Sequence, residues 1–169
     1  MSAVLQSRHA ATPADLADAL HTEARLLDKL VQVLLRQRDA IAAADVEGID
    51  ECVHSAHRVL LTLSEAQRHR RALFGTLAGT EDVPLRLLDQ ALGEAATTAV
   101  VAARDRLLDA AAVAGREVAV NRHVVEEAMA AGDAHLRLLG GVGARRLAYD
   151  ARANEVEGKN SGALINRHA

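Results

Sequence analysis

Aromatic side chains are almost absent from this sequence of 169 residues, which has one phenylalanine, one tyrosine and no tryptophan. Half of the residues are nevertheless hydrophobic, so leucine, valine and alanine must build any core. A positive charge excess is also lacking, because the formal net charge is -3. Proteins that bind nucleic acids need basic surfaces and often stack bases on aromatic rings, so the composition argues against that class. A chain of this length is expected to form one domain.

Cysteine and long apolar runs are scarce as well. Cys52 is the single cysteine, which excludes an intramolecular disulfide and a zinc site built from several cysteines. The first residues lack the apolar run of a signal peptide, and no stretch approaches the roughly 18 apolar residues that a membrane helix needs. We therefore expect a cytoplasmic protein that is not inserted in the membrane.

The two prolines lie where helices are expected to begin. Thr12 and Pro13 suit the cap and first turn of a helix from Ala14 to about Ala44. In this segment the apolar residues recur mostly at steps of three and four, which places them on one stripe of a helix: Leu16, Leu20, Leu27, Leu30, Leu34 and Ile41.

A second helix is predicted from Asp45, a fresh N-cap, to about Gly79. Its stripe is interrupted by two polar residues near the far end, and consists of Val46, Ile49, Val53, Ala56, Leu60, Leu63, Gln67, Arg70, Phe74 and Leu77. The joint near Asp45 leaves two arrangements open, an antiparallel hairpin or one bent rod. We favour the hairpin, because a joint this short is typical of antiparallel neighbours.

A third helix is predicted to begin at Asp82 and Pro84 and to reach Gly140 without a proline. Its stripe is rich in alanine and comprises Leu85, Leu88, Leu92, Ala96, Ala99, Ala103, Leu107, Ala110, Ala114, Val118, Asn121, Val125 and Ala128. Gly93, Gly115 and Gly132 each weaken a helix by about 1 kcal/mol relative to alanine. A kink or a split is open at any of the three.

These patterns predict an all-α protein, an elongated antiparallel bundle of three long helices, made of a helical hairpin and a long third helix. No alternating pattern of strands is present. We assign residues 1–12 to a flexible N-terminus and residues 13–139 to the bundle. Residues 140–169 are rich in Gly, Asn and Arg, and we expect them to form a mobile C-terminal tail.

No motif in the chain is complete enough to predict catalysis, a cofactor or a metal. Glu51 and His54 have the spacing of half a di-iron site, with His57 nearby, but no second copy exists. A small metalloprotein using these residues stays open as a third alternative. The segment Gly158–Ser161 resembles a phosphate loop only faintly, because Ala153 replaces its first glycine. We therefore expect no enzyme.

The order of features along the chain resembles the FlgN family of flagellar type III export chaperones. The first hairpin has a leucine-rich helix, the pair Arg38 and Asp39 and the joint near Asp45. It is followed by a long helix with Asn121 in VAVNRHVVEEAM, a glycine-rich break, Tyr149 and the closing segment LINRHA. Asn154 stands near where many members have glycine, a mild departure because Asn tolerates the left-handed conformation.

The resemblance implies a chaperone without catalysis. Such a protein binds the C-terminal amphipathic helices of hook-associated proteins, prevents their premature assembly and delivers them to the membrane export gate. It implies client contact at Val118, Asn121, Val125 and Ala128. A polar layer inside the free bundle is the other interpretation of Asn121. Tyr149 would dock on the cytoplasmic domain of the export-gate membrane protein, or would instead pack beside Leu147.

The runner-up function is a homodimeric helical-bundle or coiled-coil adaptor with no export role. The sequence does not separate it from the chaperone, because the same apolar stripes could pair with a second copy. The basic group from Arg68 to Arg71 can contact an acidic partner, or it can be solvated and paired with nearby carboxylates such as Glu65.

Overall fold

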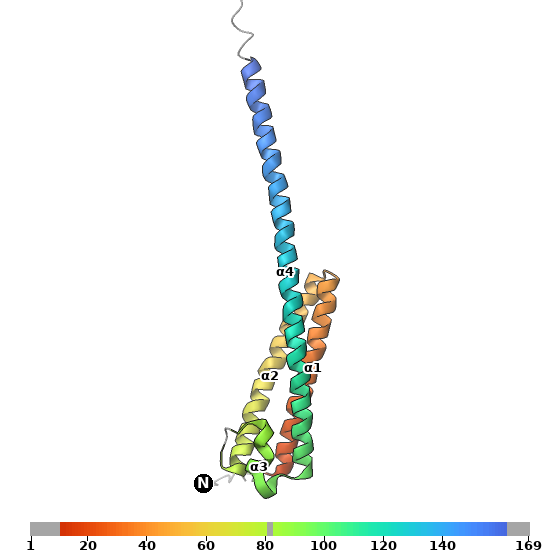
Figure 1. Ribbon diagram of the computed structural model, residues 1–169, viewed down its shortest axis with the longest axis vertical. Coiled ribbons are helices and arrows are strands. Elements are labelled where there is room, and N and C mark those ends of the chain that lie inside the picture. The colour runs from red at the N-terminus through yellow and green to blue at the C-terminus, as the bar shows by residue number, and fades with distance from the viewer. Residues whose placement is uncertain (1–10, 81–82, 162–169) are drawn as a thin grey trace, which may run out of the picture. The chain divides into compact units, whose positions relative to one another are not determined.

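The computed structural model describes residues 11–80 and 83–161, and it describes the side chains up to residue 140. Over these residues the chain is mainly helical, with short connections, and holds no strand (Figure 1). Its elements are α1 (Pro13–Ala42), α2 (Val46–Ala78), η1 (Leu85–Leu87), α3 (Leu88–Leu92), η2 (Gly93–Ala95) and α4 (Thr98–Ser161). The all-α prediction is confirmed. The chain divides into two compact units, Met1–Val124 and Val125–Ala169.

Helix α1 begins where the sequence predicts. The Thr12 hydroxyl accepts a hydrogen bond from the Asp15 backbone N–H at 3.2 Å, and the Asp15 carboxylate accepts one from the Thr12 N–H at 2.9 Å. Pro13 occupies the first turn, where its missing N–H has no helical partner to lose. This reciprocal capping box satisfies donors that the helix start would otherwise leave unpaired.

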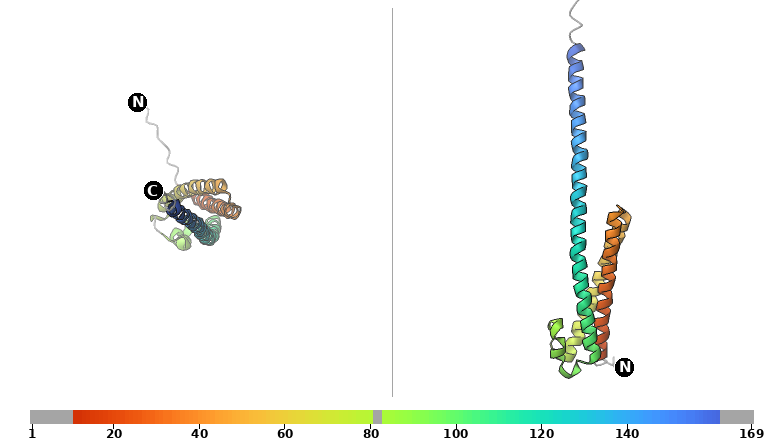
Figure 2. Two further views of the ribbon diagram at one scale, coloured as in Figure 1. Left: turned by 90° about the horizontal axis from the view of Figure 1, so that it is seen from above. Right: turned by 45° about the vertical axis from the view of Figure 1, so that its right-hand side comes forward.

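Helices α1 and α2 form an antiparallel hairpin, and they lie side by side in both views (Figures 1 and 2). The turn uses Ala44 in the left-handed conformation at φ 54°. Asp45 then caps α2 by accepting a hydrogen bond from the Gly48 N–H at 3.0 Å. A side chain at residue 48 would collide with the Asp45 carboxylate, which explains the glycine.

The expected third helix is interrupted, which corrects its predicted start at Pro84. Residues 85–95 form short helical pieces beside the end of α2, and Gly93 has φ 55°, a conformation that other residues rarely adopt. Helix α4 starts only at Thr98. The split therefore falls at Gly93, one of the three glycines left open, while Gly115 and Gly132 lie inside α4.

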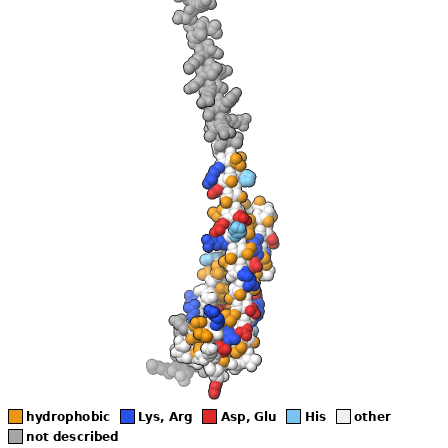
Figure 3. All heavy atoms as spheres, in the orientation of Figure 1, with side chains coloured by type: hydrophobic (Ala, Val, Ile, Leu, Met, Phe, Trp, Pro, Cys, Tyr) orange, Lys and Arg blue, Asp and Glu red, His pale blue; other side chains and the backbone are white. Residues whose placement is uncertain are grey.

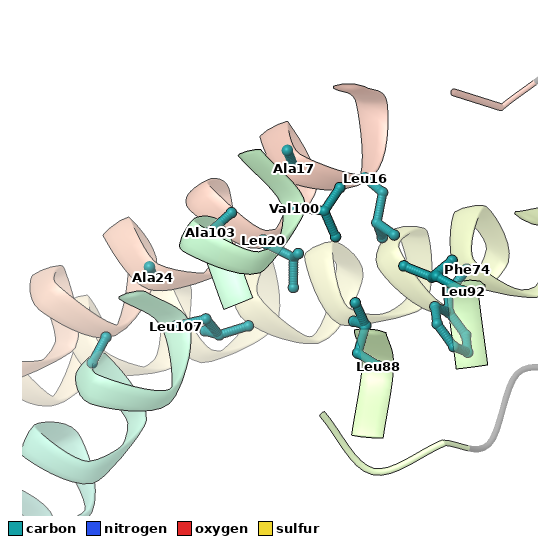
Figure 4. Packing of buried hydrophobic residues seen from close by; sticks show 11 residues of the cluster. Leu16, Ala17, Leu20, Ala24, Phe74, Leu88, Leu92, Val100, Ala103 and Leu107 are labelled. Atoms are coloured by element: carbon teal, nitrogen blue, oxygen red, sulfur yellow. The ribbon is translucent and has the colours of Figure 1, made fainter. Parts of the chain in front are cut away.

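The core of the first unit lies where α1 begins, α2 ends and α3 covers them (Figure 4). Its most deeply buried large side chains come from α1, α3 and α4 and are Leu16, Leu20, Leu88 and Val100. Phe74, the single phenylalanine, joins this cluster from α2. Burying one such side chain contributes about 1.5–3 kcal/mol, so this cluster is a large source of stability.

Within the first unit α4 runs in the same direction as α1. Asp28 of α1 forms an ion pair with Arg106 of α4, and further along Arg38 forms one with Glu117. The buried stripe of α4 consists of Val100, Ala103, Leu107, Ala110 and Ala114, which confirms the prediction from Ala103 to Ala114; Val100 is buried in place of the expected Ala99. Arg104 also ties α3 to α4 through its ion pair with Asp89 at 2.8 Å.

The predicted stripe of α2 is confirmed in part. Leu63 and Phe74 of that stripe are buried, whereas Val46, Val53 and Leu60 are exposed, the last two at 50% and 49%. Cys52, which lies beside the predicted stripe, is buried where Val53 was expected. Toward the hairpin turn the inward face of α2 is therefore rotated by one residue.

The second unit is described as helix from Val125 to Ser161, the continuation of α4. The helix end expected at Gly140 is therefore wrong, because α4 passes through Gly140, Gly141 and Gly143. The mobility of residues 140–169 and of residues 1–12 stays a prediction. The closing segment from residue 162 and the first ten residues lie outside the described residues.

Candidate partner-binding surface on α4

Asn121 is the buried polar residue of α4 and sits in line with its apolar stripe, with 7% of its surface exposed. Its side-chain Nδ2 donates a hydrogen bond to the Gln37 Oε1 of α1 at 2.7 Å. One turn earlier, Glu117 pairs with Arg38. These four residues, which we call the polar layer, hold α4 against the end of α1. Asn121 is thus part of a polar layer in the free chain, and its contact with a client stays a prediction.

The polar layer is incompletely satisfied. Within the part of the chain that the structure describes, the Asn121 Oδ1 is buried and has no hydrogen-bond partner. A buried acceptor without a donor costs about 1–3 kcal/mol, because it has lost its bonds to water. Asn121 therefore has an unused capacity to accept one hydrogen bond.

The three apolar residues that the resemblance places beside Asn121 are more accessible than Asn121 is. Val118 is 46% exposed, in the first unit. In the second unit, Val125 is half-buried and Ala128 is exposed. The predicted contact residues thus share α4, but only Asn121 is buried.

The second unit carries further large apolar side chains that the sequence analysis did not single out. Met129, Leu136, Leu138 and Leu139 are all exposed on α4. Their signal was present in the sequence, since Leu136 and Leu139 continue the steps of three and four through Gly132.

Tyr149 lies on the part of α4 whose side chains are outside the described residues. Its backbone is helical, in the second unit. Its role in docking on the export gate stays a prediction, as does its packing beside Leu147.

The basic group on α2 is paired with carboxylates, as one of its two interpretations holds, but its member Arg70 is not solvated. The Arg70 Nε donates to the Glu23 Oε1 of α1 at 2.7 Å, and Glu23 is 2% exposed. Burial raises the pKa of the Glu23 carboxyl, and the neighbouring Arg70 opposes this shift. Arg68 and His69 are exposed, and Arg68 lies 4.0 Å from the expected Glu65.

The residues considered for a metal or a nucleophile lie near the other end of α2. His54 and Glu51 are exposed, and the His54 Nδ1 lies 2.9 Å from the backbone oxygen of Asp50. Cys52 is buried against α1. Among the residues described, no group of three or more His, Cys, Asp or Glu side chains is placed to hold a metal ion.

Comparison with family models decides the family. The sequence model of the FlgN protein family matches residues 12–157, which is most of the chain. The chain belongs to the FlgN family. Comparisons with curated proteins and with solved structures give no significant match. No described helix is long and apolar enough to span a membrane.

FlgN membership gives the protein a general role as a flagellar export chaperone with flagellar proteins as its partners, in a family of chaperones and not of enzymes. The matched residues include the polar layer, the exposed stretch of α4 and Tyr149. They end before LINRHA, so the similarity of that closing segment to the family is not part of the match.

Proposed function

We propose that this FlgN chain binds the C-terminal amphipathic helices of hook-associated proteins, prevents their premature assembly and delivers them to the export gate. The client would lie along Val118, Asn121, Val125 and Ala128, in the cytoplasm. The observation that carries the proposal is the exposure of large apolar side chains on α4, such as Val118 and Leu136. The three long helices would act as one antiparallel bundle that presents this stripe.

Exposed apolar side chains on a helix are the complement of an amphipathic partner helix. Such partners place apolar residues at steps of three and four against a matching stripe. The small residues Ala128 and Gly132 favour a close approach of the two backbones, while Met129 adds a flexible apolar contact. The client's own stripe is then shielded from aggregation until export.

Asn121 gives this contact a specific register. A client helix with an amide or hydroxyl donor in its stripe would satisfy the Asn121 Oδ1 after a rotation of that side chain. A single polar residue in an apolar seam selects one register, because every other register leaves it unpaired.

Delivery requires a second contact. Tyr149 is the single tyrosine of the chain, and one aromatic ring can supply much of the energy of a weak complex. We place it against the cytoplasmic domain of the export-gate membrane protein, separate from the client stripe.

The second candidate is the homodimeric adaptor without an export role. The exposed Leu136 and Leu139 favour it to the same extent, because a second copy of α4 would also cover them. A stable homodimer that binds no flagellar helix would support this candidate.

The proposal is tested by replacing Val125 with aspartate. The new charge would enter the apolar contact at a cost of several kcal/mol unless it reaches water, so client affinity should fall at least tenfold. Val120→Asp is the matched control, since Val120 is on the same helix, is exposed and lies off the stripe. Calorimetry with the client segment measures both affinities, and circular dichroism checks folding. Unchanged client affinity in a folded Val125→Asp variant would remove this surface from the proposal.

A further inference from the structure

An open groove lies along the seam of α1 and α2, midway between the hairpin turn and the core. Its volume is about 350 Å³. Val33, which is buried, and the half-buried Val59 supply its apolar part. The side chains around them include Lys29, Arg36 and Arg58, all exposed. We call this site the seam groove.

The three cations of the seam groove are available to a ligand. None of them forms an ion pair within residues 11–80 and 83–140, and Arg58 donates one hydrogen bond to the Ser55 hydroxyl at 3.1 Å. The carboxylate that lines the groove, Asp28, is already paired with Arg106. On the face seen in Figure 3, Lys and Arg side chains are interspersed with Asp and Glu.

Acidic grooves flank the seam groove on both sides. Toward the hairpin turn, the next groove shares Arg36 with the seam groove and is otherwise lined by the carboxylates of Asp39, Asp45 and Glu51. Toward the helix ends, another is lined by Asp15 and Asp18. An acidic ligand is therefore attracted to the middle of the seam and repelled at both ends. Residues 28–36 of α1 span about 12 Å, which sets the length of the ligand.

We propose that the seam groove binds a short acidic segment of a partner protein. Its carboxylates face Lys29, Arg36 and Arg58, and one aliphatic side chain packs on Val33 and Val59. A segment fits better than a small molecule, because sites for small molecules usually enclose most of the ligand's surface and this groove is open. The proposal is independent of the client surface, because no residue of that surface lines the groove.

The test uses a fluorescent pentapeptide with one central leucine and two acidic residues on each side, about 13 Å long when extended, titrated with the full-length protein. Fluorescence anisotropy should show saturable binding that weakens as salt rises. The double variant Arg36→Glu and Arg58→Glu should lose at least tenfold in affinity. Arg68→Glu with Arg86→Glu is the matched control, since it makes the same charge change outside the groove and should bind normally.

Two further peptides separate the chemistry. Replacing the four acids by their amides should abolish binding, and replacing the leucine by serine should weaken it. Absence of binding, an equal loss in the control variant, or full affinity of the amide peptide would overturn the proposal. Displacement by inorganic phosphate at constant ionic strength would also overturn it, since that would indicate a simple anion site. Client affinity should be unchanged in the Arg36 and Arg58 variant, which separates this test from that of the α4 surface.

Discussion

Glu23 and Arg70 are a pair of charged side chains that α1 and α2 bury together. Replacing Arg70 with alanine would leave the Glu23 carboxylate buried without its cation, and breaking such a pair typically costs roughly 3–5 kcal/mol. Arg68→Ala is the control, because the exposed pair with Glu65 is worth about 1 kcal/mol or less. Urea unfolding followed by circular dichroism measures both changes.

The loss caused by Arg70→Ala should depend on pH. Burial raises the pKa of Glu23 in the folded state, and removing Arg70 removes the contact that opposes this rise. The folded state of the variant then binds a proton more readily than the unfolded state, so its stability falls as pH rises through the window above the ordinary value of 4.5. The variant should be closer to the parent at pH 5 than at pH 8. Equal losses for Arg70→Ala and Arg68→Ala at both pH values would contradict this assignment.

A substitution at Asn121 should affect the free energy of unfolding and the affinity for a client differently. Asn121→Leu removes the unpaired Oδ1 and leaves the half-buried Gln37 able to reach water, so we expect unchanged stability or a gain of up to about 1 kcal/mol. Client affinity should fall, because the contact that fixes register is lost. Urea unfolding and calorimetry on the same variant measure the two effects. Unchanged client affinity would confine Asn121 to the polar layer.

The elements divide into those with strong local signals and those without. Thr12 as a cap and Asp45 as an N-cap predicted the start of α1 and the hairpin, because each cap bonds to a residue three positions away. The pair of Glu23 and Arg70 joins residues 47 positions apart, which no local pattern can indicate. Glycine was the poorest signal for helix ends, since the helix is interrupted at Gly93, whereas Gly115 lies inside α4. A penalty of about 1 kcal/mol weakens a helix but does not decide where it ends.

The first half of α2 shows why a stripe alone does not fix a face. Leu63 and Phe74 of the predicted stripe are buried, but Val53 and Leu60 of the same stripe are exposed and Cys52 is buried instead. The packing against α1 decides which of these neighbouring residues lies inside. The same limit applies to the candidate surface, where the sequence named the residues of α4 but did not predict the bond from Asn121 to Gln37.

The prediction for delivery of the client to the export gate concerns Tyr149, in the C-terminal part of α4. Tyr149→Ala should weaken binding to the cytoplasmic domain of the export-gate protein and leave client affinity intact, because a single anchoring ring is lost away from the client stripe. Leu147→Ala is a control from the same segment. Surface plasmon resonance with the client already bound measures the gate affinity. Equal gate affinity of Tyr149→Ala and the parent would remove the tail from the mechanism.

For the whole molecule, the chaperone and the adaptor differ in what covers the apolar side chains of α4. A chaperone must release its client for export, so its own self-association has to be weaker than client binding. An adaptor instead gains its stability from a permanent second copy. The two functions therefore predict different masses for the same mixture.

The decisive measurement is the mass of the full-length protein mixed with a hook-associated protein of the same organism, obtained by light scattering during size-exclusion chromatography. The proposed function predicts one peak whose mass equals one copy of each protein, and the loss of that peak for Val125→Asp but not for Val120→Asp. Two separate peaks, with this chain eluting at twice its own mass and no hook-associated protein bound, would contradict the chaperone and support the adaptor.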